Sequence, residues 1–174
     1  MGGVIEFEDP EWLAAGAVGA PGQRTFLVQA ETEDGDRITV LVEKQQVATL
    51  ADELQAFLTR LADEVPPQPD EMLVPTRPST VTEDVPAFRA FSMAIGWLPD
   101  RRRVLIELHE NPPIDAGEEQ VLDPDGHVLR IFATRGAVRA MAEAAIIAVG
   151  QGRPPCPLCE FPMDPDGHIC PRWN

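Results

Sequence analysis

The chain has 174 residues, of which 44% are hydrophobic and 25% are charged, as in a folded globular protein of one domain or of one domain with a small appendage. Its formal net charge of −15 argues against nonspecific binding to nucleic acid or to an anionic membrane, because both would repel an acidic surface. No apolar run approaches the length of a membrane span, and residues 1–10 carry no basic residue, so we expect a cytoplasmic protein.

The first half of the chain changes from a strand pattern to a helix pattern. Residues 25–30 (TFLVQA) and 37–43 (RITVLVE) are rich in β-branched and aromatic residues, and an Asp-Gly turn signal lies between them. Residues 45–64 then place apolar side chains at intervals of three and four, which predicts an amphipathic helix. Residues 66–86 contain six prolines and are interpreted as a linker or a long surface loop.

The second half repeats this order. Residues 87–98, 103–110 and 127–133 are expected to be strands, and 111–120 an acidic loop. Thr134 can cap a helix over 135–150.

An offset of 90 residues aligns the segments 12–64 and 87–150 without gaps, although few residues are identical. We therefore predict an α+β fold: an antiparallel sheet with helices on one face, built from a duplicated βββα unit. Residues 1–152 would form this body, and residues 153–174 a zinc-binding knuckle or ribbon.

The C-terminal tail contains every cysteine of the chain. Cys156 and Cys159 have the CxxC spacing of one edge of a metal site, and His168 and Cys170 follow after eight intervening residues. Cys₃His is a known set for structural zinc, and four protein ligands leave no open position for catalysis. The alternatives are a surface dithiol or redox pair, and the pattern does not distinguish zinc from iron.

His168 is the weakest of these ligands. The pentapeptide Asp-Pro-Asp-Gly-His occurs at 164–168 and also at 123–127, where no cysteine is nearby. It could therefore be a turn unrelated to metal, with Asp164 or Asp166 as the fourth ligand.

No catalytic constellation emerges, so the sequence favours a non-enzymatic protein and leaves an enzyme as the alternative. His109 and Glu107 would share one strand face, as a general base or as a solvated strand edge. The second hypothesis is an enzyme or an anion-binding protein with a site in the cleft between the two βββα halves, lined by Arg24, Lys44, Gln45, Gln46, Arg89 and His109.

The chain resembles the uncharacterised actinobacterial DUF3090 family. The resemblance rests on 19–26 (GAPGQRTF), 43–47 (EKQQV), 152–159 (GRPPCPLC) and 166–172 (DGHICPR), and it covers nearly the whole chain. Members usually carry Gly after the second cysteine, where this chain has Glu160. The family has no assigned activity, and its members are linked to a ParA-type chromosome segregation ATPase.

The resemblance therefore implies an adaptor or regulator that acts through protein–protein interaction. We expect structural zinc as the cofactor and a protein as the partner, and we expect neither nucleic acid nor a membrane.

Overall fold

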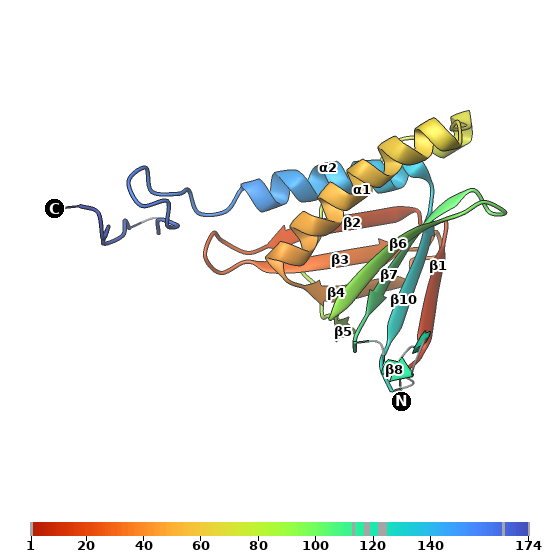
Figure 1. Cartoon of the computed structure of the whole chain (residues 1–174), viewed down its shortest axis with the longest axis horizontal. Coiled ribbons are helices and arrows are strands. Elements are labelled where there is room, and N and C mark those ends of the chain that lie inside the picture. The colour runs from red at the N-terminus through yellow and green to blue at the C-terminus, as the bar shows by residue number, and fades with distance from the viewer. Residues whose placement is uncertain (1, 113, 117–118, 122–124, 165, 174) are drawn as a thin grey trace.

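The computed structural model describes residues 2–112, 114–116, 119–121, 125–164 and 166–173. It contains two four-stranded sheets, a two-stranded ribbon, two α-helices and a short 3₁₀ helix, which confirms the α+β class (Figure 1). The elements in chain order are β1 (Val4–Glu8), β2 (Trp12–Val18), β3 (Thr25–Glu31), β4 (Arg37–Val42), α1 (Lys44–Glu64), η1 (Pro69–Met72), β5 (Phe88–Arg89), β6 (Ser92–Leu98), β7 (Arg103–His109), β8 (Ile114–Ala116), β9 (Glu119–Val121), β10 (Val128–Ala133) and α2 (Arg135–Gly150).

Both four-stranded sheets are mixed rather than purely antiparallel. One sheet has the order β2-β3-β4-β5 and the other β1-β10-β7-β6. Three strands of each are antiparallel neighbours, and the fourth is parallel: β5 beside β4, and β1 beside β10. The sequence β2-β3-β4-α1 is thus matched by β6-β7-β10-α2 in strand order and pairing sense. This matches the predicted βββα pattern, whereas its origin by duplication stays a prediction.

The two units are joined by an exchange of strands. β1 precedes the first unit but pairs with β10 of the second, and β5 precedes the second unit but pairs with β4 of the first. The strand that leads into the first unit, β1, therefore completes the sheet of the second unit. The strand that leads into the second unit, β5, completes the sheet of the first.

The expected strand over 87–98 is wrong as a single strand, because it divides between the two sheets. The backbone N–H of Ala90 donates to the carbonyl of Leu41 in β4, whereas that of the next residue, Phe91, donates to His109 in β7. The apolar pattern continues across this step because both strands contribute to one core. The expected loop over 111–120 likewise contains β8 and most of β9.

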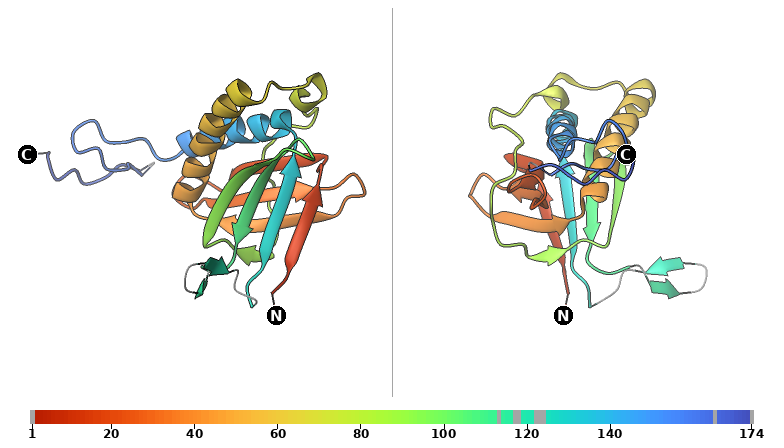
Figure 2. Two further views of the ribbon diagram at one scale, coloured as in Figure 1. Left: turned by 45° about the vertical axis from the view of Figure 1, so that its right-hand side comes forward. Right: turned by 90° about the vertical axis from the view of Figure 1, so that its left-hand side faces the viewer.

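One hydrophobic core joins both sheets to both helices. The inner faces contribute alternate residues, such as Val28 and Val40 from one sheet and Ile106 and Ile131 from the other. The helices lie beside each other along one side of the sheets (Figure 2), and α1 buries Leu50, Leu54 and Leu58 at helical spacing. Both helices were predicted within one residue of their observed bounds. Within the described residues, neither helix is both long and apolar enough to cross a membrane.

The proline-rich segment 66–86 packs against the first sheet rather than hanging free. Gln29, fully buried in β3, donates to the Thr82 carbonyl and accepts from the Thr82 N–H, both at 2.9 Å. The Trp12 indole donates to the Pro78 carbonyl at 2.9 Å. We call 66–86 the strap. It gives the sheet a second covered face, which explains why Trp12 and Gln29 are buried although they point away from the core.

Candidate metal centre

The tail, residues 153–174, folds its first cysteine pair into a tight turn. The N–H of Glu160 donates to the Cys156 carbonyl at 2.9 Å, and the N–H of Cys156 donates to the Phe161 carbonyl at 2.8 Å. A further N–H, that of Leu158, donates to the Cys156 sulfur at 3.5 Å. The turn places the sulfurs of Cys156 and Cys159 on the same side as the second ligand pair, His168 and Cys170.

The four predicted ligands lie together. One donor atom from each of Cys156, Cys159, His168 and Cys170 lies within 4.8 Å of the others. The sulfurs of Cys156 and Cys170 are 3.8 Å apart, and the Cys159 sulfur is 3.5 Å from Nε2 of His168. These residues could hold a metal ion.

The two distances have the lengths of tetrahedron edges. With metal–sulfur bonds of about 2.3 Å and metal–nitrogen bonds of about 2.0–2.1 Å, a tetrahedral ion gives an S–S edge of about 3.8 Å and an S–N edge of about 3.6 Å. Both agree with the observed separations. A disulfide would need two sulfurs about 2.05 Å apart, and all three cysteines are free.

The backbone also favours the thiolate that a metal requires. Hydrogen bonds from the N–H groups of Cys159 and Leu158 stabilise the Cys156 sulfur as an anion and lower the pKa of that thiol to about 6. Burial raises the pKa of Cys159. The first cysteine is thus already prepared for metal at neutral pH.

Glu160 directly follows the second cysteine of the CxxC turn. Its φ of 63° lies in the left-handed region that L-residues other than glycine rarely adopt. The knuckle turn therefore forms with a glutamate, at a cost in backbone strain.

The two aspartates considered in place of His168 as the fourth ligand are not part of the cluster. Asp164 forms an ion pair with Arg153 at 2.7 Å, and Asp166 is exposed and outside the cluster. The other copy of the pentapeptide uses its histidine differently: His127 Nδ1 lies 2.6 Å from the Glu110 carboxylate. Residues 123 and 124 of that copy lie outside the described residues.

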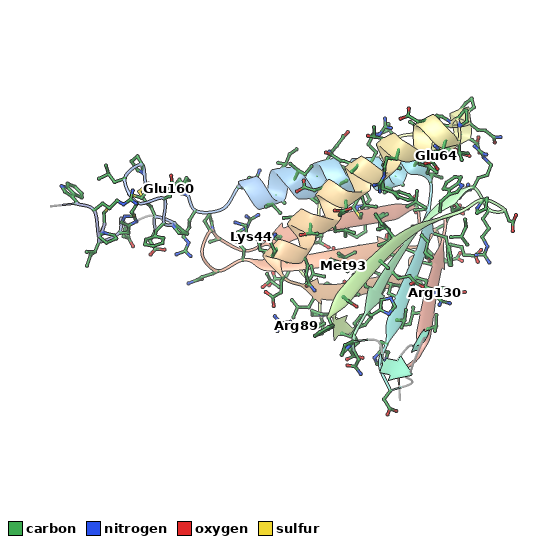
Figure 3. All side chains as sticks on the ribbon, viewed as in Figure 1. Lys44, Glu64, Arg89, Met93, Arg130 and Glu160 are labelled. Atoms are coloured by element: carbon green, nitrogen blue, oxygen red, sulfur yellow. The ribbon has the colours of Figure 1, made fainter. Side chains whose placement is uncertain are left out.

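The six residues expected in a cleft are not brought to one place. Arg24 and Lys44 line the same small pocket, together with Arg153 (Figure 3 shows Lys44 at the start of α1, on the side from which the tail extends). Arg89 pairs with Glu43 beside a different hollow. His109 is buried at the end of β7, with its Nε2 atom 3.4 Å from Glu107.

A groove does exist at the seam between the halves. It has a volume of about 430 Å³ and lies between α1 and the edge strand β6, with Gln45, Gln46, Leu50, Phe91 and Met93 among its lining residues. Met93 is labelled on β6 in Figure 3. Of the six residues expected in the cleft, Gln45 and Gln46 line this groove, whereas Arg24, Lys44, Arg89 and His109 do not.

Sequence reasoning missed two buried polar groups. Glu71 of η1 and Arg135 of α2 are almost fully buried, with Arg135 Nε 3.0 Å from Glu71 Oε2. Arg102 also pairs with Glu71. An acid in a proline-rich segment gives no periodic signal, so only the fold identifies its partners.

Residues 5–170 match the model of the family described as "Protein of unknown function (DUF3090)". The chain belongs to the DUF3090 family. The match includes all four candidate ligands. No curated protein and no solved structure matches the chain.

Proposed function

We propose that this DUF3090 protein is a non-enzymatic, cytosolic adaptor whose tail is a zinc-organised docking module. The observation that carries the proposal is the convergence of three sulfurs and one imidazole nitrogen within 4.8 Å of one another. Cys₃His is a donor set of structural zinc sites, and four protein ligands complete a tetrahedron, which supports a stabilising rather than a catalytic ion.

The tail needs such an ion because it has little core of its own. None of its described residues belongs to the hydrophobic core of the body, and its buried apolar side chains are only those of Cys156 and Cys170. A segment of this kind gains its folding free energy from metal coordination.

The same tail exposes large apolar side chains. Ile169 is 99% exposed, Trp173 76% and Phe161 62%, and Leu158 is half exposed. Several exposed large apolar side chains within one short segment are typical of regions that bind another protein. Trp and Phe are also frequent among the residues that dominate binding energy. We therefore assign the contact with the partner to the tail.

The charge of the chain indicates the kind of partner. A net charge of −15 favours association with a basic protein surface and speeds the encounter with it. The ParA-type ATPase implied by the resemblance is the first partner to test.

The metal is tested by elemental analysis of the purified full-length protein, with two variants that change the same pentapeptide. We expect one zinc per chain in the unmodified protein and in His127→Gln, and loss of the zinc in His168→Gln. Equal zinc in both variants would remove His168 from the site, and no zinc in the unmodified protein would refute the centre.

The docking role is tested with the zinc-loaded full-length protein. Replacing Ile169 and Trp173 by Ser should weaken binding to a ParA-type ATPase by about 100-fold, since hot-spot truncations cost about 2 kcal/mol or more. Val85→Ser, which changes an exposed apolar residue of the strap, should leave binding unchanged. Binding that survives the tail substitutions would place the interface elsewhere.

A further inference from the structure

We propose that the junction between body and tail is a binding site for a phosphate-class oxyanion. A pocket of about 180 Å³ opens where the start of β3, the start of α1 and the end of α2 meet. Its lining residues are Gly22, Arg24, Phe26, Lys44, Gly152 and Arg153. Three cations thus surround one small polar hollow in a protein whose net charge is −15.

Arg24 gives the clearest indication of a binding site. Its Nη1 atom is buried and has no hydrogen-bond partner among the described residues. A buried guanidinium N–H without a partner is costly, and such groups are rarely left unsatisfied in native proteins. The guanidinium is held over the Phe26 ring, 5.3 Å from its centroid, so its position is set by packing rather than by a carboxylate.

Lys44 faces the same hollow from the first residue of α1. It is the only lysine of the chain, and no described carboxylate lies within ion-pair distance of it. A Cβ built on Gly152 would lie 3.1 Å from Lys44 Nζ, so the ammonium reaches across to the end of α2. The glycine leaves room for that approach.

Arg153 completes the group from the root of the tail. Its side chain passes close to Gly22, where a built Cβ would lie 3.6 Å from Arg153 Cδ. Its guanidinium binds Asp164, and Glu43, which precedes Lys44 in the chain, is bound by Arg89. No carboxylate is among the residues that line the pocket, which leaves the charges of Arg24 and Lys44 for a ligand.

The volume of the pocket and its hydrogen-bond donors determine the class of ligand that it can bind. The pocket is smaller than the roughly 300–1,000 Å³ of sites for drug-sized molecules, so it suits a compact group. Guanidinium and ammonium groups bind phosphate oxygens with charge-assisted hydrogen bonds. The other acids of the body repel an anion only weakly, because salt screens charges more than about 8–10 Å away. The ligand is free phosphate or the phosphate group of a small monoester.

The test is calorimetric titration of the zinc-loaded full-length protein with inorganic phosphate and with glycerol 3-phosphate, in chloride buffer of about 0.15 M ionic strength, where the screening length is about 8 Å. We expect saturable binding of one phosphate group per chain. If the monoester binds more tightly, the site takes the terminal phosphate of a larger ligand. If inorganic phosphate binds as tightly, the ligand is the free ion. Either result supports the site.

The variants decide whether the binding is at this pocket. Arg24→Gln and Lys44→Gln should each weaken affinity about tenfold or more, and Arg60→Gln, which removes an exposed arginine of α1, should not. Asp164→Asn should strengthen binding, because it frees Arg153. No binding of either probe at millimolar concentration, or equal affinity in Arg24→Gln and Arg60→Gln, would overturn the proposal.

Discussion

At the scale of single residues, Glu160 adopts a backbone conformation that suits glycine. With φ at 63°, an L-side chain costs about 1–2 kcal/mol relative to a right-handed conformation, whereas glycine pays almost nothing. Glu160→Gly should therefore raise zinc affinity by about fivefold to thirtyfold, measured by competition with a chelator. Glu64→Gly, at the exposed end of α1, is the control and should leave the affinity unchanged. An unaltered affinity in Glu160→Gly would mean that the turn is not strained.

The ion pair formed by Glu71 and Arg135 is a second feature at this scale, and it contributes to the stability of the fold. Both side chains are at most 2% exposed, and Arg135 also donates to the Val65 carbonyl at 2.9 Å. Glu71→Gln would leave a buried guanidinium without its counter-charge, which costs about 3–5 kcal/mol. Chemical denaturation at pH 7 measures this loss. Glu64→Gln should change stability by less than about 0.5 kcal/mol.

The same carboxylate makes stability depend on pH. Burial alone would raise the pKa of Glu71, but hydrogen bonds from Arg102 and from the Gln68 N–H, with the charge of Arg135, hold it below its ordinary value of 4.5. A lowered native pKa contributes stability above pH 4.5 that is lost as the pH falls through the native pKa. The stability difference between the unmodified protein and Glu71→Gln should therefore shrink below pH 4.5. A constant difference down to pH 3 would contradict this.

At the scale of elements, the strap is held against the start of α2 by a close backbone approach. A Cβ built on Gly136 would lie 2.1 Å from the Leu73 carbonyl oxygen, whereas one on Gly150 would meet nothing within 4 Å. Both glycines are in α2, so the same substitution can be compared at a crowded and at an open position of one helix. Gly136→Ala should lower the melting temperature, because the strap must move away. Gly150→Ala should leave it unchanged or raise it by improving helix propensity. Equal melting temperatures would mean that the strap docks loosely.

At the scale of the whole molecule, body and tail depend on different stabilising terms. The body is held by one hydrophobic core that includes both sheets and both helices but no described residue of the tail. Removing the metal with a chelator should unfold the tail and leave the cooperative unfolding of the body intact. Limited proteolysis should then cut within 153–174, while the melting transition of the body shifts by only a few degrees. Collapse of the body on chelation would show that the tail is part of its fold.

The helices and the candidate metal ligands followed from the sequence because each leaves a local signal. The side-chain spacing of α1 is a property of one helix, and the CxxC spacing reflects the geometry of one turn. The cations of the proposed phosphate site were only partly predicted from the sequence. Arg24 and Lys44 were expected near an anion, but Arg153 comes from a segment more than 100 residues away. The strand division at Ala90 and Phe91 left no signal, because both strands bury apolar residues in one core.

The sequence by itself thus determined the periodic elements, the α+β class and the residues able to bind a metal, since these depend on neighbours a few positions apart. Only the tertiary structure decided which sheet each parallel edge strand joins, that the strap covers the first sheet, and that Glu71 meets Arg135. These features depend on how buried backbone groups and buried charges are paired, and the partners are residues that lie far apart in the sequence.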